Sequence, residues 1–192
     1  MLVTIPSRVL ARALDNWCGH GAPNKKIPDF ILFHLDERIL RAFLQGYEIG
    51  DSYDNVNKLR GNKIYRICVT TSRILAEQLQ LAYARLGIWA GIYVRKSGNE
   101  GFIMGRKCEL HPKYAVSYPL EPNVKRQKVR FLEDKILSPI RDTTKMTYNG
   151  KIHNLGTTDG TYLVSNAVVH NCGKWFKTEF ELNLHTKLHY II

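Results

Sequence analysis

The segment between Asp36 and Asp51 constrains the fold of this chain more than any other. Asp36 is suited to cap the start of a helix. Apolar residues then recur at helical spacing and form one stripe: Leu40, Phe43, Leu44 and Tyr47. Small residues repeat every four positions on another face: Ala42, Gly46 and Gly50. Because small residues let two helix backbones approach closely, the pattern predicts a helix packed against a core on one face and against a second helix on another.

Asp51 lies at the predicted C-terminal end of this helix. The last carbonyls of a helix already carry about half a negative charge, so a further carboxylate there is repelled. A divalent cation would remove that penalty, and oxygen ligands suit Mg²⁺, which can activate water and stabilise the leaving group of a phosphodiester. The alternative is that Asp51 is only a polar residue ending a core helix.

Charge and composition indicate a globular chain with an anionic partner. The chain has 192 residues, 44% of them hydrophobic, with a net charge of +11, which favours a polyanion such as nucleic acid over a merely basic surface. No apolar run approaches the ~20 residues needed to span a bilayer, so we expect no membrane association. The four cysteines show no paired spacing, which predicts reduced thiols in a cytoplasmic, intracellular setting.

Downstream of Asp51 the sequence predicts an α+β order of elements. Arg60 to Lys63 is typical of a hairpin turn, and residues 63–70 are typical of a strand. A helix is expected at about 72–86, closed by Gly87. A second hairpin turns near 97–101, before a strand that ends at about residue 118. The expected order is helix, two strands, helix, two strands, helix.

Residues 43–52 resemble the signature helix of the LAGLIDADG homing endonucleases, and residues 24–31 resemble the linker before the second signature helix. The resemblance implies an αββαββα repeat whose concave antiparallel sheet lies in the DNA major groove, with Asp51 as the Mg²⁺ ligand. Ile49 departs from the motif's first acid, and Ser52 from its last Gly. Since cleavage of both strands needs two signature helices, the resemblance implies a homodimer or an absent N-terminal half.

The candidate strands carry side chains suited to phosphates or base edges. The proposed contacts with double-stranded DNA are Tyr53, Asn55, Asn57, Lys58, Arg60, Arg66, Arg95 and Lys96. Lys125 and Lys128 occupy the place where the family tends to keep a catalytic lysine, which could polarise the attacking water or balance phosphate charge. A solvated basic helix start is the alternative for either lysine.

A second resemblance covers residues 151–172, which match the C-terminal splicing blocks of inteins nearly position for position. His170, Asn171 and Cys172 would supply the chemistry: Asn171 attacks its own carbonyl carbon, His170 assists, and Cys172 provides a thiol nucleophile. Asn154 stands where an Asp is common, and Gly160 where a His often sits. Both departures predict slow final steps.

The tail has the spacing of half a zinc finger, with Cys172 followed by His185 and His189. The position where the first Cys would fall holds Val169, so a Zn²⁺ site is expected only after splicing joins Cys172 to a host segment. A tail with two chance histidines is the alternative.

These resemblances predict a Hint-type splicing domain interrupted by the endonuclease and followed by host sequence. The expected parts are the end of a preceding endonuclease repeat with its linker (1–30), the endonuclease repeat (31–135), the β-rich C-terminal splicing segment (136–171) and a host fragment with a short helical tail (172–192). We find no upstream signature helix or N-terminal splicing nucleophile, so we expect Met1 to be an internal start, a split product or a truncated gene model. The alternatives are a DNA-binding module that does not cut, with a zinc-binding tail, and an inactive intein remnant.

Overall fold

The computed structural model describes residues 5–58, 61–95, 100–103, 105–109, 111–121, 129–132, 136–140, 142–145, 147–150, 155–164 and 166–170. The chain divides into two compact units, residues 1–126 and 127–192. We describe each unit by itself. The division at 126/127 differs from the boundary expected from sequence at 135/136.

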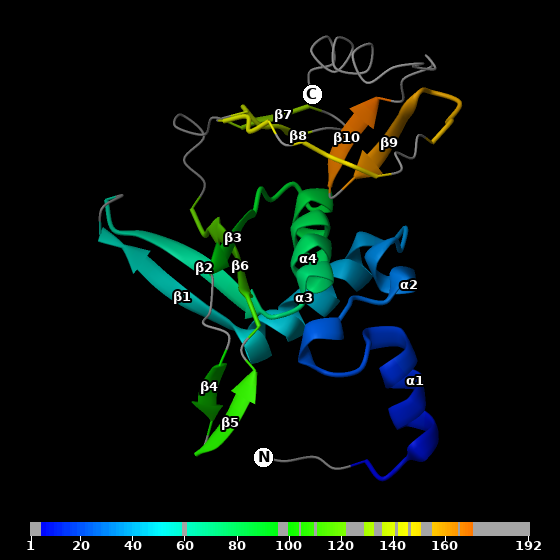
Figure 1. The fold of residues 1–192 in the computed structure, drawn as a ribbon, viewed down its shortest axis with the longest axis vertical. Helices are drawn as coiled ribbons and strands as arrows, with labels where there is room; N and C mark the ends of the chain where they lie inside the picture. Colours follow the sequence, from blue (N-terminus) through cyan, green and yellow to red (C-terminus); the bar gives the residue numbers. More distant parts are fainter. Residues whose placement is uncertain are drawn as a thin grey trace. The chain divides into compact units, whose positions relative to one another are not determined.

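The first unit is built on a four-stranded antiparallel sheet with the strand order β1-β2-β6-β3. Its elements are α3 (Glu37–Asp51), β1 (Ser52–Asn57), β2 (Lys63–Thr70), α4 (Arg73–Arg85), β3 (Gly91–Arg95) and β6 (Lys113–Pro119). A separate hairpin of β4 (Glu100–Ile103) and β5 (Arg106–Glu109) lies between β3 and β6 in the chain. Helix α4 packs against β2, β3 and β6 (Figure 1). The mixed helix and strand composition agrees with the predicted α+β class, and α3, β1, β2 and α4 follow in the predicted order. After α4 the prediction of two strands with a turn near 97–101 is wrong, because residues 100 and 101 belong to β4 and the β4–β5 hairpin is additional.

Local sequence signals set the ends of these elements. Asp36 Oδ1 accepts a hydrogen bond from the Arg38 amide at 2.9 Å, which caps α3 as predicted. Ser72 Oγ accepts one from the Leu75 amide at 3.1 Å and caps α4. The β1–β2 turn uses the left-handed region at Gly61 (φ 73°) and Asn62 (φ 59°), residues that tolerate it. The predicted hairpin is therefore confirmed.

The core lies between the two helices and one face of the sheet. Its fully or nearly fully buried members include Leu40, Leu44, Cys68, Leu75, Leu79, Tyr83, Val116 and Tyr118. Phe43 and Tyr47 are partly buried at its edge and stack with ring centroids 6.4 Å apart. The apolar stripe predicted for α3 thus faces the core.

The small-residue face of α3 has no packing partner among the described residues. Ala42, Gly46 and Gly50 are exposed, and a Cβ added at Gly46 or Gly50 would meet nothing within 4 Å. Ile49, one position before Gly50, is 82% exposed. The second helix expected on this face therefore stays a prediction.

The N-terminal segment contributes to the same core. It contains α1 (Arg8–Cys18), the short 3₁₀ helix η1 (Ala22–Asn24) and α2 (Asp29–Leu32). Ile27 is fully buried, and its amide donates to Gln78 Oε1 at 2.6 Å while Gln78 Nε2 donates back to the Ile27 carbonyl at 3.2 Å. Ser72 Oγ donates to the Lys25 carbonyl at 2.6 Å. Part of the segment expected to hold the end of a preceding repeat and its linker (1–30) is thus integral to the first unit from residue 25 onward.

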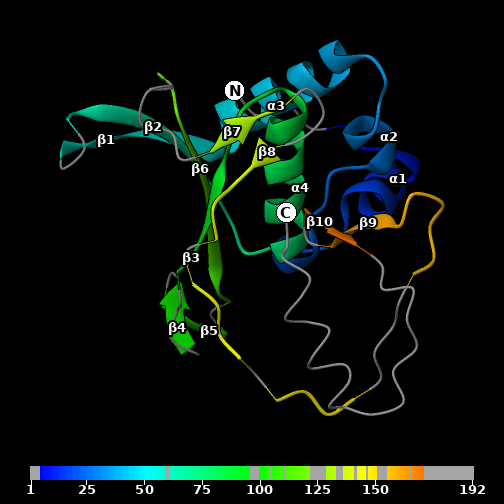
Figure 2. The ribbon, with the colours of Figure 1, turned by 90° about the horizontal axis from the view of Figure 1, so that it is seen from above.

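Strands are the regular elements of the second unit within its described residues. These are β7 (Arg130–Phe131), β8 (Ile136–Leu137), β9 (Thr161–Val164) and β10 (Ala167–His170), which pair antiparallel as β7–β8 and β9–β10 (Figure 2). The closing helix expected after β6 falls partly on residues 122–128 and 133–135, outside the described residues. Between them, residues 130 and 131 are strand, so the expected helix does not run through this segment.

Candidate nucleic-acid and metal site

The sheet has two chemically different faces, which the strand register identifies. Cys68 of β2 pairs with Val116 of β6 and with Ser52 of β1, and the first two are buried in the core. We call this the covered face. Because side chains alternate along a strand, the neighbours of these residues belong to the opposite side, which we call the open face. Its polar and aromatic residues include Tyr53, Asn55, Asn57, Lys63, Tyr65, Tyr93, Arg95 and Lys113. Two apolar residues at the centre of the same side, Ile67 and Ala115, are buried.

Most of the described DNA-contact candidates lie on the open face. Tyr53, Asn55 and Asn57 alternate along β1, and Arg95 ends β3. Tyr53, Asn55 and Arg95 are exposed, as is Lys58, which follows β1. Antiparallel strands of this kind fit the major groove, where Asn can pair with adenine and Arg with guanine or phosphate. Arg60 and Lys96 lie outside the described residues.

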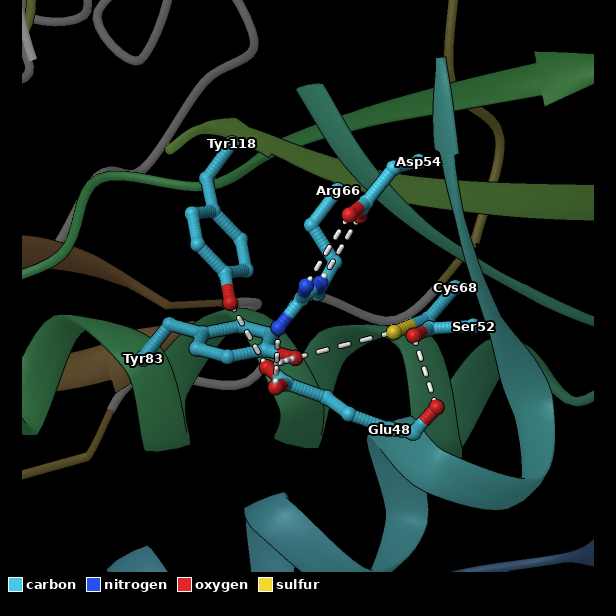
Figure 3. Close-up of polar contacts among 7 residues, drawn as sticks. All are labelled: Glu48, Ser52, Asp54, Arg66, Cys68, Tyr83 and Tyr118. Carbon is cyan, nitrogen blue, oxygen red and sulfur yellow. Dashed lines mark hydrogen bonds and ion pairs between the residues drawn. The ribbon is translucent and has the colours of Figure 1, made fainter. Parts of the chain in front are cut away.

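Arg66 differs from the other candidates because it belongs to the covered face. Its Nε and Nη2 donate to Asp54 Oδ1 and Oδ2 at 2.9 and 3.1 Å, and its Nη1 donates to Glu48 Oε2 at 3.1 Å (Figure 3). The guanidinium is therefore engaged by two carboxylates. We therefore leave Arg66 out of the proposed DNA surface. Apolar residues occur on both sides of β2, so alternation along this strand did not show which face Arg66 occupies.

Glu48 is the residue of this region that the sequence analysis missed. Its side chain is 15% exposed, and Oε1 accepts hydrogen bonds from Tyr83 Oη at 2.8 Å and Tyr118 Oη at 2.7 Å. Together with Arg66, these donors satisfy a carboxylate that would otherwise be costly to bury. A sequence signal existed, since Glu48 follows the buried Leu44 by four positions and so shares its helix face.

The protonation states of the cluster are set by burial and by Arg66. The hydrogen bonds from Arg66 lower the pKa of Asp54, so its carboxylate is ionised at neutral pH. Burial, reinforced by the nearby Glu48, raises the pKa values of Tyr83 and Tyr118. Both hydroxyls therefore keep their protons and act as donors. Burial also raises the pKa of the Cys68 thiol, whose sulfur lies 3.6 Å from Tyr83 Oη.

Asp51 is the last residue of α3, as predicted, and its side chain is exposed. The next residue, Ser52, donates from both its amide and its hydroxyl to the Glu48 carbonyl, the latter at 2.7 Å. Within the part of the chain that the structure describes, the Asp51 carboxylate has no hydrogen-bond or ion-pair partner, and no group of three His, Cys, Asp or Glu residues could hold a metal. Asp51 fits a cation at a helix C-terminus, as one ligand of a site completed from elsewhere.

The splicing candidates are only partly visible. His170 ends β10, is exposed and stands opposite Thr161 in the β9–β10 ladder. Gly160 has a φ of 73°, a conformation that a His at this position would adopt only with strain. Asn171, Cys172, His185, His189, Lys125, Lys128 and Asn154 lie outside the described residues. No helix among the described residues is long and apolar enough to cross a membrane.

Comparison with known families finds a match over residues that carry this site. Residues 38–110 match the model of the LAGLIDADG-like domain. The match includes α3 with Asp51, both strands of the first hairpin, and α4. This part of the chain is therefore similar to the LAGLIDADG-like domain.

The chain is also similar to segments of larger proteins with unrelated names. It is 32% identical over 171 residues to iron–sulfur cluster assembly SufBD family proteins of Mycobacterium bovis and Mycobacterium tuberculosis, which covers 88% of this chain and 20% of those proteins. It is 30% identical over 167 residues to the ATP-dependent DNA helicase Hel308 of Thermococcus kodakarensis, covering 80% of this chain and 14% of the helicase. A DNA polymerase of the same organism is 38% identical over 88 residues, 46% of this chain and 5% of the polymerase. The chain thus spans a fifth or less of each relative.

Proposed function

We propose that this chain is part of an intein-borne homing endonuclease that cuts double-stranded DNA with Mg²⁺ when two signature helices come together. The proposal rests mainly on what is found at the C-terminal end of α3, within the residues that match the LAGLIDADG-like domain. There the exposed carboxylate of Asp51 terminates a helix whose small-residue face is open. A second copy of the helix could approach along Gly46 and Gly50 and bring a second acid beside the first.

In this arrangement each signature helix provides one carboxylate as a metal ligand, and the two carboxylates together allow cleavage of both strands of the duplex. Bound Mg²⁺ would polarise an attacking water and stabilise the oxygen that leaves phosphorus. The protein's own part is to hold Asp51 at the helix C-terminus, where the negative end of the helix dipole favours a cation. Lys125 and Lys128 stay candidates for balancing phosphate charge, in a segment that the structure does not describe.

The open face of the sheet is the proposed DNA surface. Asn55 and Asn57 lie on the same side of β1 and are suited to base edges, while Arg95 and Lys58 are suited to phosphates. Lys63 and Lys113 belong to the same face and join the proposal, although sequence analysis did not select them. The net charge of +11 provides the non-specific attraction.

A nicking assay tests the endonuclease. Supercoiled plasmid carrying the uninterrupted host gene is incubated with the chain at micromolar concentration, with and without Mg²⁺. We expect Mg²⁺-dependent nicked and linear products, and none above background for Asp51→Asn. Asp15→Asn is the matched control, because Asp15 is an exposed helical acid on α1, far along the sequence from the site. Absence of wild-type nicking, or equal nicking by Asp51→Asn, would overturn the proposal.

A binding module that does not cut is the alternative function, and the same samples address it. Retained DNA binding in a gel-shift assay without any nicking would support this alternative. Loss of both activities from a folded protein would support an inactive remnant.

A second proposed activity is C-terminal splicing chemistry. Segments similar to this chain occur in an iron–sulfur assembly protein, a helicase and a polymerase, which is the distribution expected of an inserted element. In the proposed step, the Asn171 side-chain nitrogen bonds to its own main-chain carbonyl carbon, and the peptide bond to Cys172 breaks. His170, at the end of β10, would help the departing amine take up its proton.

Intact mass spectrometry tests this second activity. We expect slow release of a fragment that begins at Cys172, blocked in Asn171→Ala. If the folded chain releases no such fragment, even after the N-terminal half is added, the splicing proposal fails. The Zn²⁺ site of Cys172, His185 and His189 belongs to the spliced host protein and would be tested there by metal analysis.

A further inference from the structure

Three elements meet around Asp51. Helix α3 ends at this residue, β1 begins at the next, and β2 pairs with β1 along its whole length. Arg66 of β2 links the other two, because it donates to Glu48 on the last turn of α3 and to Asp54 on β1. We call Glu48, Arg66 and Asp54 the clamp. Its two acids lie three positions before and three positions after Asp51 in the sequence.

The clamp is well suited to fix an angle. Arg66 uses three different nitrogens of its planar guanidinium, so both carboxylates must keep a defined orientation. A lysine at this position would supply a compact charge and could not hold both acids with the same geometry. The side chains of Glu48 and Arg66 are only 15% and 30% exposed, which limits screening by solvent.

The clamp is also anchored to the core. Glu48 Oε1 receives hydrogen bonds from Tyr83 of α4 and Tyr118 of β6, whose rings lie 4.8 Å apart (Figure 3). The Glu48 carbonyl receives the Ser52 hydroxyl at 2.7 Å. Glu48 and Ser52, on either side of Asp51, are therefore held by hydrogen bonds, whereas the Asp51 carboxylate itself is exposed.

From this geometry we propose that Arg66 is a positioning residue that acts on cleavage through Asp51 and not by touching DNA. The clamp sets the direction in which β1 leaves α3, and so places the Asp51 carboxylate relative to DNA on the open face. The inference rests on the proposed endonuclease function. Residues that orient a metal ligand from outside its contact shell typically change metal affinity or activity by about 10- to 100-fold.

The test separates DNA binding from cleavage in the full chain. DNA affinity is measured with Ca²⁺ in place of Mg²⁺, and single-turnover cleavage is measured at saturating DNA over a Mg²⁺ series. For Arg66→Met we expect an affinity within about twofold of wild type, a cleavage rate lower by about tenfold or more, and a Mg²⁺ midpoint raised by a similar factor. Arg66→Lys should lie between wild type and Arg66→Met.

Arg73→Met is the matched control. Arg73 also donates from Nε to a carboxylate, that of Glu77 at 2.8 Å, but it does so on the exposed side of α4 and outside the proposed machinery. We expect this variant to match wild type in affinity, rate and Mg²⁺ midpoint. Weaker DNA binding by Arg66→Met at an unchanged saturated rate would show that Arg66 contacts DNA, and would overturn the inference. A smaller active fraction with an unchanged Mg²⁺ midpoint would show only a structural role, and would also overturn it.

A readout without activity keeps the inference separate from the proposed function. We expect amide hydrogen exchange at Asp51 and Ser52 to be faster by about tenfold or more in Arg66→Met, while the amides of α4 keep their protection. If wild type does not cut DNA, the endonuclease proposal fails and this measurement still decides whether the clamp fixes the junction. Unchanged exchange at residues 51 and 52 would refute the clamp.

Discussion

The covered and open faces of the four-stranded sheet use the same strands for different purposes. On the covered face, Arg66 binds two carboxylates, one of which also accepts hydrogen bonds from two buried tyrosines. On the open face, Arg95 and Tyr93 are exposed. The same residue types, arginine and tyrosine, are therefore structural groups on the covered face and proposed binding groups on the open face. Matched pairs of substitutions on the two faces test this difference.

The largest effect is expected for truncation of a buried tyrosine of α4 that packs against the covered face. Tyr83 is 1% exposed, and Tyr83→Ala removes both its core packing and a donor to Glu48. We expect a loss of about 3–5 kcal/mol in the free energy of unfolding. Tyr93→Ala, at a side chain 58% exposed on the open face, should cost no more than about 1 kcal/mol. Urea unfolding followed by circular dichroism measures both, and equal losses would contradict the difference in burial between Tyr83, on the covered side, and Tyr93, on the open face.

The next effect concerns DNA affinity and compares two arginines. We expect Arg95→Met to weaken binding by about tenfold, or about 1.4 kcal/mol, and to reduce the slope of log affinity against log salt by about one. Arg66→Met should leave both quantities nearly unchanged, because its guanidinium is held by Glu48 and Asp54. Fluorescence anisotropy over a salt series distinguishes the two variants. A larger loss of affinity for Arg66→Met than for Arg95→Met would contradict the proposal that DNA binds the open face.

A smaller effect is expected when only a hydroxyl is removed. Tyr118→Phe deletes the 2.7 Å hydrogen bond to Glu48, which should cost about 1 kcal/mol of stability. Tyr53→Phe on the open face should be close to neutral, because this side chain is 46% exposed and its hydroxyl is accessible to water. Chemical denaturation of both variants provides the comparison. A larger loss of stability for Tyr53→Phe than for Tyr118→Phe would contradict the placement of Tyr53 on the open face of β1.

The smallest effect is a pH dependence from Asp54. Arg66 lowers the folded-state pKa of Asp54 below its unfolded value of about 3.9, so the ion pair stabilises the fold above that pH. The contribution is lost as pH falls through the lower, folded-state pKa. We therefore expect wild type to be more stable than Asp54→Asn at pH 7, and the difference to shrink below about pH 4. A difference that grows on acidification would contradict the ion pair.

Local patterns predicted the elements that bear the site. The cap at Asp36, the apolar stripe of α3 and the turn at Gly61 and Asn62 were all readable from spacing and residue type. They placed Asp51 correctly at the end of a helix and put Asn55 on a strand beside it. These features depend on neighbours within a few positions, which is why they could be found without the fold.

Long-range partners were not predictable in the same way. Ile27 belongs to the core through a hydrogen-bonded pair with Gln78, and Glu48 is satisfied by Tyr83 and Tyr118. Each of these contacts joins distant parts of the chain. Arg66 was grouped with the DNA contacts by its charge, and only the register of β2 against β1 showed which side of the sheet it occupies.

The sequence by itself determined α3, the first hairpin and α4, the basic charge and the likeness of residues 38–110 to the LAGLIDADG-like domain, because those follow from local spacing and composition. The tertiary structure decided which acid is buried and which is exposed. Glu48 and Asp51 lie three positions apart on one helix, and they differ because the first faces two tyrosines and an arginine while the second ends the helix in solvent.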